Sequence, residues 1–120
     1  MTLTALPLAG LKVLELGQLI AGPFAAKTLA DFGAEVIKIE PPGAGDPLRK
    51  WRLLKDGTSV WWQVQARNKR SVALDLKDPA AQGLVRRLAD AVGAAVVQRQ
   101  QNTDHAMQRG QRVKIGRAHV

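Results

Sequence analysis

A glycine-bounded loop between residues 17 and 22 is the part of the sequence whose composition best suits binding chemistry. Gly17 and Gly22 bracket the loop, Gln18 is its one long polar side chain, and Pro23 follows, where the first turn of a helix tolerates a missing N–H. Free N–H groups at such a helix start attract anions, commonly phosphates. The pattern indicates either a site for a phosphate-bearing ligand or glycines that only permit a tight turn.

Charged residues are grouped at two further places. Asp46 stands before Pro47 and suits the N-cap of a short helical turn, although Asp46 and Arg49 could also pair or reach a ligand. A basic cluster flanks a later predicted strand and consists of Arg67, Lys69, Arg70 and Lys77. Either these cations meet phosphates held by the first loop, or they form an ordinary solvated turn.

Composition excludes several kinds of site. The chain of 120 residues has no cysteine, which removes disulfides, thiolate catalysis and cysteine–zinc sites, and its two lone histidines, His105 and His119, make a poor metal site. We therefore assign no metal ligand. Half of the net charge of +8 comes from residues 98–120, whereas all the aromatic residues lie before residue 63. A basic stripe with interleaved aromatics is thus missing, and we expect no nucleic-acid partner.

Membrane and secretion signals are also missing from the sequence. No apolar run approaches the ~20 residues that span a bilayer. The N-terminus lacks the basic and apolar regions of a signal peptide. We expect a cytoplasmic protein with no membrane partner.

A strand–helix–strand unit positions the glycine loop. Residues 12–16 and 35–40 are short apolar runs typical of strands, and the segment between them has helical spacing from Pro23 onward. Gly33 stands where a helix C-cap needs a positive φ. The two strands should be parallel, with a right-handed crossover, and the glycine loop should lie at the carboxyl edge of their sheet.

A second unit follows the same pattern. Residues 71–76 alternate as a strand, Asp78 and Pro79 start a helix that continues to residue 91, and residues 93–97 would be a fourth strand. The fold class is therefore α/β, with a parallel sheet of βαβ units. Residues 98–120 are rich in Gln and Arg and lack periodicity, which favours an irregular, disordered tail.

Several motifs in order resemble a known family. The chain reads L-x-G-L-K-V-L-E-L, A-G-P-F-A and L-A-D-F-G-A-E-V-I-K-I-E-P-P-G-A-G-D-P-L-R, then R-N-K-R-S-V-A-L-D-L-K-D-P. Over about residues 6–92 this resembles the N-terminus of the family III CoA-transferases, the group of formyl-CoA transferase, carnitine CoA-transferase and α-methylacyl-CoA racemase. The resemblance implies that residues 1–97 are part of a Rossmann-like, CoA-binding large domain.

The resemblance also implies a function and partners. Members move CoA from an acyl-CoA to a carboxylic acid through an aspartyl-CoA thioester, with coenzyme A as substrate and no permanently bound cofactor, and they form interlocked homodimers. The CoA contacts carry over to Ile20, Ala21, Leu74, Asp75, Leu76 and Lys77. Lys77 is the best candidate for a phosphate contact. Formyl-CoA transferases have glutamine at the position of Ile20 and arginine at that of Pro41, which puts formyl specificity in doubt.

The C-terminal part departs from the family. V-V-Q-R-Q-Q-N-T-D-H replaces the expected E-N-F-x-P-G motif, and the nucleophilic aspartate would lie beyond it, so no catalytic residue is assigned to this chain. Asp31, Asp46 and Asp75 do not occupy its position. Our hypothesis is a truncated reading frame, with a frameshift near residues 93–98 and a non-native tail over residues 98–120. We expect such a fragment to be inactive alone.

Three other functions stay open. The α-methylacyl-CoA racemase or epimerase of the same family shares these N-terminal motifs. A dinucleotide-binding Rossmann domain would use Glu40 to hold a ribose hydroxyl, but G-x-G-x-x-G is absent. A non-catalytic module that binds CoA or another nucleotide is the third possibility.

Overall fold

Two crossover units build one sheet in the computed structural model, which describes residues 5–92, 95–98 and 114–117. The helices and strands are, in chain order, β1 (Lys12–Glu15), α1 (Ala21–Asp31), β2 (Glu35–Glu40), the 3-10 helix η1 (Pro47–Lys50), β3 (Leu54–Lys55), β4 (Thr58–Ser59), α2 (Val60–Gln65), β5 (Lys69–Ala73), α3 (Pro79–Val92), β6 (Ala95–Gln98) and β7 (Lys114–Arg117).

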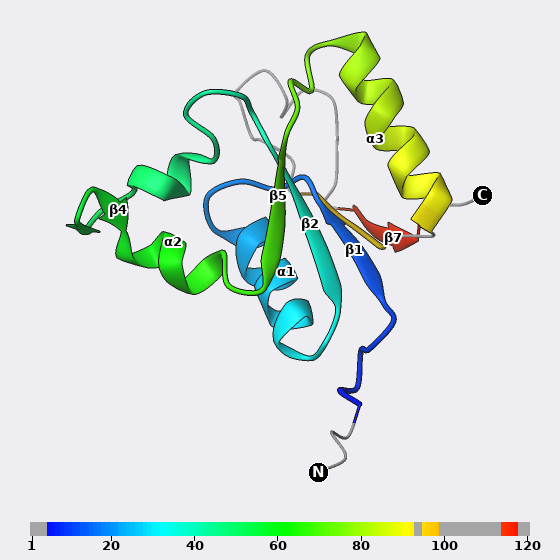
Figure 1. Ribbon diagram of the computed structural model, residues 1–120, viewed down its shortest axis with the longest axis horizontal. Helices are drawn as coiled ribbons and strands as arrows, with labels where there is room; N and C mark the ends of the chain where they lie inside the picture. Colours follow the sequence, from blue (N-terminus) through cyan, green and yellow to red (C-terminus); the bar gives the residue numbers. More distant parts are fainter. Residues whose placement is uncertain (1–4, 93–94, 99–113, 118–120) are drawn as a thin grey trace.

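The main sheet has the strand order β5-β2-β1-β6-β7 (Figure 1). Strands β5, β2, β1 and β6 are parallel, and β7 pairs antiparallel with β6. β3 and β4 form a separate two-stranded hairpin, which lies with η1 and α2 beside β5 in Figure 1. The predicted α/β fold with a parallel sheet of βαβ units is confirmed.

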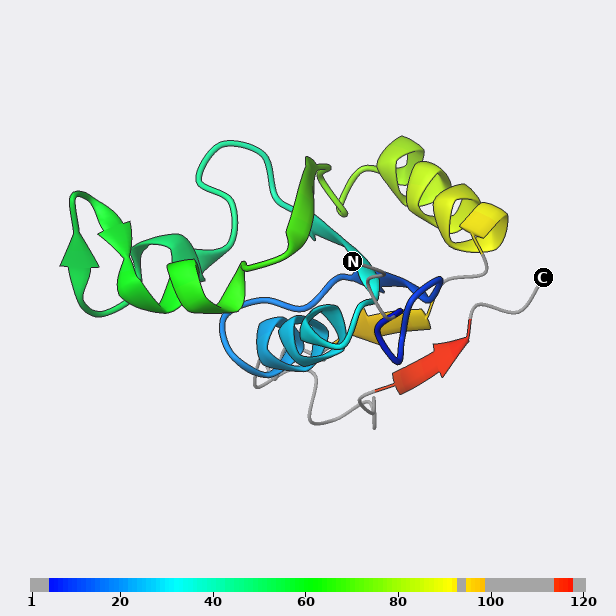
Figure 2. The same ribbon diagram turned by 60° about the horizontal axis from the view of Figure 1, so that its bottom comes forward.

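The sheet is covered on both faces, as Figure 2 shows with α1 and α3 on opposite sides of the strands. Successive residues of a strand point to opposite faces. Val13 accordingly packs with Ala26 and Ala30 of α1, whereas Leu14 packs with Val85 of α3. Because helices cover both faces of the sheet, the adjacent residues Val13 and Leu14 are both apolar and buried, and β1 shows no alternation of apolar and polar residues.

Local sequence signals explain most element boundaries. β2 spans the predicted residues, and Gly33 has the expected positive φ of 108° after α1. Asp78 caps the start of α3 by accepting a hydrogen bond from Ala80 N at 3.0 Å. α1 begins at Ala21, two residues before the predicted Pro23.

β5 differs from its prediction, since it spans Lys69–Ala73 rather than residues 71–76. The register with β2 pairs Val36 with Lys69 and Glu40 with Ala73, so β5 ends where β2 ends. Residues 74–77 then leave the sheet. The alternating pattern that predicted a strand over these residues comes from Leu74 and Leu76. Leu74 packs on the core, whereas Leu76 does not.

The C-terminal segment was expected to be irregular. The structure differs at Lys114–Arg117, where β7 extends the sheet beyond β6. Residues 99–113 and 118–120 lie outside the described residues. Among the helices that the structure describes, none has the length and apolar character needed to cross a bilayer.

Candidate functional site

Three loops leave the sheet at the carboxyl ends of β1, β2 and β5, which are adjacent and parallel. They gather at one edge, the upper one in Figure 1. Leu19 N donates a 3.0 Å hydrogen bond to Asp46 Oδ1, which joins the first two loops. Leu74 N donates to Glu40 O at 2.9 Å, which holds the third against β2. Open parallel sheets bind their ligands at this edge.

The loop after β1 combines two touching glycines with one left-handed residue. A Cβ atom on Gly22 would lie 2.7 Å from Gly17 Cα, so glycine is required for this close approach. The left-handed residue is Leu19, with φ of 67°. Ile20, the N-cap residue of α1, makes no side-chain cap hydrogen bond, and within the described residues the N–H groups of Ala21 and Gly22 have no acceptor. Such a helix start attracts anions.

Four buried charged side chains connect the strands to this loop, and we call them the buried charge chain. They alternate in sign in the order Lys69, Glu15, Lys38, Asp46. Lys69 Nζ lies 2.8 Å from Glu15 Oε2, and Lys38 Nζ lies 3.1 Å from Glu15 Oε1 and 2.7 Å from Asp46 Oδ2. No member is more than 3% exposed, and the four charges cancel. Cancellation is what makes such burial tolerable.

Burial also changes the acid–base properties of the buried charge chain. Burial lowers the pKa of Lys69, while the carboxylate of Glu15 opposes that shift. The carboxylate of Asp46 also opposes the lowering of this pKa, whereas the ammonium of Lys38 adds to it. The ammonium group of Lys69 also donates to Pro23 O at 2.8 Å, in the first turn of α1.

Glu40, the last residue of β2, belongs to a second polar group. Its Oε1 accepts from Asp46 N and Arg49 Nε, both at 2.8 Å, and its Oε2 accepts from Arg49 Nη2 at 2.7 Å and from Ser71 Oγ. Burial raises the pKa of Glu40, but the hydrogen bonds from Arg49, Asp46 and Ser71 outweigh it and lower that pKa to about 2. The Arg49 guanidinium also lies 4.0 Å from the ring of Trp62.

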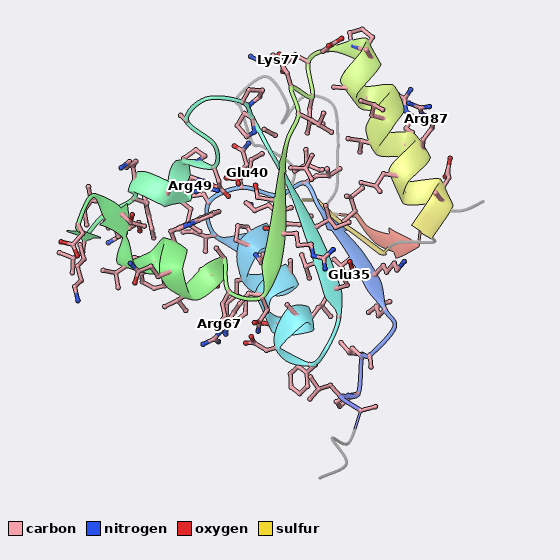
Figure 3. All side chains as sticks on the ribbon, in the orientation of Figure 1. Glu35, Glu40, Arg49, Arg67, Lys77 and Arg87 are labelled. Atoms are coloured by element: carbon pink, nitrogen blue, oxygen red, sulfur yellow. The ribbon has the colours of Figure 1, made fainter. Side chains whose placement is uncertain are left out.

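The other predicted contact segment, Leu74–Lys77, forms the turn between β5 and α3 (Figure 3). Leu74 is partly buried in the core, whereas Asp75, Leu76 and Lys77 are exposed. Asp75 Oδ1 accepts from Lys77 N at 3.0 Å, and its backbone carbonyl accepts from Asp78 N at 2.9 Å. The turn is thus set by local hydrogen bonds. The Lys77 ammonium has no hydrogen bond or ion pair within the described part of the chain.

The structure brings the two predicted contact groups to one edge without joining them. Ile20 and Ala21 follow β1, the segment Leu74–Lys77 follows β5, and β2 lies between those strands. No hydrogen bond links the groups among the described residues. An elongated ligand would have to pass over the loop that follows β2. Contact of these residues with a ligand stays a prediction.

The members of the basic cluster lie at different places in the structure. The hypothesis that they form one phosphate-binding group is therefore wrong for Arg67, Lys69 and Arg70. Arg67 and Lys77 lie at opposite ends of β5 in Figure 3. Arg67 Nη2 pairs with Asp31 Oδ2 at 3.1 Å. Arg70 Nη1 lies 3.4 Å from Glu35 Oε1 on β2. Lys69 is buried. The reason is that a five-residue strand separates the two edges of the sheet.

Two further alternatives are also corrected. Asp46 does cap η1, since its Oδ1 accepts from Leu48 N at 2.9 Å, but it pairs with Lys38 rather than Arg49. Glu40 is 3% exposed and both its oxygens are occupied, so it has no free acceptor for a ribose hydroxyl. The hypothesis of a dinucleotide-binding domain therefore lacks the residue that would hold the ribose.

The buried charge chain was missed by the sequence interpretation, although a signal existed. Glu15 and Lys38 are the charged residues inside two otherwise apolar runs, and they are direct partners in the register of β1 and β2. Opposite charges at matching positions of two predicted parallel strands indicate a buried ion pair. Lys69 and Asp46 lack such a signal, because their approach depends on the loop after β2 and on strand order.

No metal centre is formed by the part of the chain that the structure describes, since no three His, Cys, Asp or Glu side chains converge there. The carboxylates at the carboxyl edge, those of Glu40, Asp46 and Asp75, already accept hydrogen bonds from the chain itself. The other polar groups described there include the N–H groups at the start of α1 and the ammonium of Lys77. This set suits an anionic ligand rather than a metal ion.

Comparisons with known proteins give a consistent result. The family model "CoA-transferase family III" matches residues 8–115. A succinyl-CoA–D-citramalate CoA-transferase of Chloroflexus aurantiacus is 58% identical over 68% of this chain and 21% of the relative. A succinyl-CoA:glutarate CoA-transferase of Homo sapiens is 48% identical over 69% of this chain and 19% of the relative. The chain therefore spans about a fifth of the length of these relatives.

A solved structure supports the fold assignment. The crystal structure of a CAIB/BAIF family protein from Brucella suis has a TM-score of 0.68 and 38% identity to this chain. The match covers 79% of this chain and 26% of that protein. The architecture described above is thus part of a larger known one.

Proposed function

Because the chain belongs to CoA-transferase family III, we propose that it forms the CoA-binding edge of an enzyme that moves CoA from an acyl-CoA to a carboxylic acid. The names of two relatives suggest the substrate class, since both use succinyl-CoA and accept a dicarboxylic acid. Succinyl-CoA as donor and a small dicarboxylic acid as acceptor are therefore the first substrates to test on the full-length enzyme.

The observation that carries the proposal is the arrangement of the carboxyl edge. The N–H groups at the start of α1 and the ammonium of Lys77, which have no partner among the described residues, lie at the same edge of a parallel sheet. Both suit phosphate groups, which CoA carries on its nucleotide. The contacts proposed for CoA are Ile20, Ala21, Leu74, Asp75, Leu76 and Lys77.

The proposed reaction needs a nucleophilic carboxylate, and the described aspartates near the site are otherwise engaged. Asp46 is buried in the charge chain, Asp75 caps the turn before α3, and Asp31 pairs with Lys27 and Arg67 on the surface. We therefore assign the aspartate that attacks the thioester, and so forms the anhydride and the aspartyl-CoA intermediates, to a segment beyond this chain. The chain alone should bind CoA without transferring it, and the full-length enzyme should be a homodimer.

Isothermal titration of the 120-residue chain with coenzyme A tests the binding role. We expect CoA to bind and NAD not to bind at the same concentration. Lys77→Gln should weaken CoA binding about three- to tenfold, and less at high salt, because one screened charge–phosphate contact is lost. Lys55→Gln, which removes an exposed lysine from the β3–β4 hairpin, is the matched control.

Four results would count against this proposal. Equal binding of CoA and NAD would favour a general nucleotide site, and equal effects of the two lysine variants would remove Lys77 from it. CoA transfer by the purified chain would contradict the assignment of the nucleophile. For the full-length enzyme, epimerisation of an acyl-CoA without an acceptor acid would favour the racemase reading.

A further inference from the structure

Residues 47–66, which we call the edge unit, form a small group of elements beside β5 (Figure 1). The edge unit contains η1, the β3–β4 hairpin and α2, which contact one another, and α2 also contacts α1. Neither of the two hydrophobic clusters described above for the sheet includes one of its residues. Within these residues, all of which the structure describes, Leu48 is the one buried apolar side chain. Apolar packing therefore contributes little to holding the edge unit against the sheet.

Most large apolar side chains of the edge unit lie in contact with solvent. The exposed ones are Leu53, Leu54, Val60, Trp61 and Val64. Segments with few buried apolar contacts open at a lower free energy than a core does. Because opening would expose little further apolar surface, it should cost much less than unfolding of the whole chain.

A bidentate ion pair fastens the edge unit to the end of β2. Arg49, in η1, donates from Nε to Glu40 Oε1 at 2.8 Å and from Nη2 to Glu40 Oε2 at 2.7 Å (Figure 3). The same guanidinium lies 4.0 Å from the ring of Trp62 in α2. Arg49 thus joins a carboxylate of the sheet to two elements of the edge unit. Bidentate pairs with a carboxylate are strong and directional, so this pair suits a latch.

Both ends of the edge unit adjoin the buried charge chain. Asp46, just before the unit, lies 2.7 Å from Lys38 Nζ, and its Oδ1 accepts from Leu48 N at 2.9 Å. After the unit, Asn68 has φ of 64°, and Lys69 is the buried end of the same charge chain. The ends of the edge unit are therefore fixed, whereas its body is held to β2 by Arg49.

We propose that the edge unit opens as one cooperative unit while the sheet stays folded, and that the pair of Arg49 and Glu40 is the latch that keeps it closed. Once detached, a short hairpin and a six-residue helix do not keep their own hydrogen bonds. Opening uncovers Glu40 at the end of β2, which lies between the two strands that carry the predicted CoA contacts. It thereby regulates the carboxyl edge, and in this last respect the inference rests on the CoA-binding function proposed above.

Amide hydrogen exchange of the 120-residue chain without CoA tests whether the edge unit opens independently. The unit's reporters are the amides of Val60 and Ala66, each of which donates a hydrogen bond inside the unit. The core reporter is the amide of Val36 in β2, which is 1% exposed. After division by the intrinsic rates, Val60 and Ala66 should exchange at least tenfold faster than Val36.

A core substitution then separates local opening from global unfolding. Leu14→Ala should raise the exchange rate of Val36 at least tenfold, because Leu14 is buried in the sheet core. It should change the rates of Val60 and Ala66 less than twofold, because the sheet core is intact in both the closed and the open unit.

Two arginine variants of the edge unit test the latch. Arg49→Gln should raise the exchange rates of Val60 and Ala66 at least tenfold, because the pair with Glu40 exists only in the closed unit. Arg52→Gln is the matched control, since the Arg52 guanidinium lies 4.4 Å from the ring of Trp51 inside the unit. It should raise these rates less than threefold. If Arg49→Gln does not fold, Arg49→Lys replaces it, and loss of the bidentate bond should raise the rates at least fivefold.

The results that would overturn the inference are distinct. If Leu14→Ala speeds exchange at Val60 and Ala66 as much as at Val36, the edge unit opens only when the whole chain unfolds. If Arg49→Gln and Arg52→Gln raise the rates equally, the pair with Glu40 is not the latch. Because no CoA is present, neither result bears on the binding function, and a failure of the chain to bind CoA leaves the opening of the edge unit standing.

Discussion

Replacement of Glu40 by glutamine should make the stability of this protein less sensitive to acid. Glu40 has a pKa of about 2 in the folded chain against an ordinary value of 4.5. Because the folded-state pKa is the lower one, the ionised side chain stabilises the fold at every pH above 4.5. That contribution is lost as the pH falls through 4 towards 2, where folded Glu40 takes up its proton.

The size of the effect follows from the pKa difference. A shift from 4.5 to about 2 corresponds to roughly 3 kcal/mol of unfolding free energy at neutral pH, at about 1.4 kcal/mol per unit. The partner Arg49 is 38% exposed, so solvent screening reduces this to about 2 kcal/mol. Glu40→Gln keeps the shape of the side chain and one acceptor oxygen but removes the titrating charge. The difference in stability between the two proteins should therefore shrink by more than half between pH 7 and pH 3.

Urea denaturation followed by circular dichroism at pH 7, 5, 4 and 3 gives this difference directly. Glu35→Gln is the matched control, because Glu35 lies on the same strand but pairs with Arg70 at 3.4 Å in an exposed position. It should change the unfolding free energy little at any of these pH values. A difference for Glu40→Gln that stays constant from pH 7 to pH 3, or that equals the control, would refute the reasoning.

Other substitutions test the packing and the buried charges, each by urea denaturation at pH 7. Gly22→Ala should destabilise the fold by about 1 to 3 kcal/mol, because its Cβ would lie 2.7 Å from the Gly17 backbone. Gly83→Ala, with nothing within 4 Å of the new Cβ inside α3, should instead stabilise it by about 0.5 to 1 kcal/mol. If Gly22→Ala cost no more stability than Gly83→Ala, the close approach would be wrong. Lys38→Met should cost about 3 to 5 kcal/mol, since two buried carboxylates lose their shared cation; a neutral result would mean that they are hydrated or protonated. Leu14→Ala, at a position 1% exposed, should cost about 2 to 5 kcal/mol, and a loss below about 1 kcal/mol would contradict its place in the core.

Local sequence signals predicted the helices and strands whose limits are set by residues close together in the chain. The apolar runs predicted β1 and β2, Gly33 marked the end of α1, and Asp78 with Pro79 marked the start of α3. Each depends on residues a few positions apart, so the sequence displays it directly. β5 begins two residues and ends three residues before its predicted limits, because these limits follow its register with β2 rather than its own alternation.

The candidate site was predicted less completely. The glycine loop and the segment that ends at Lys77 were found, since the order of parallel strands places both at the carboxyl edge. The reason for the glycines in this loop was not predicted, because the sequence cannot distinguish a glycine needed for positive φ from one needed for close approach. The left-handed residue is Leu19, which carries no such mark in the sequence.

The sequence by itself determined the fold class, the family, and the placement of the glycine loop and of Lys77 at the carboxyl edge of the sheet, because periodicity, turn residues and ordered motifs are all read along the chain. Only the tertiary structure decided which charges meet. Lys69 reaches Glu15, and Lys38 reaches Asp46, because the order β5-β2-β1 brings distant residues together in a buried space. Burial makes every unpaired charge costly, so pairing there is decided by three-dimensional proximity, which no local pattern records.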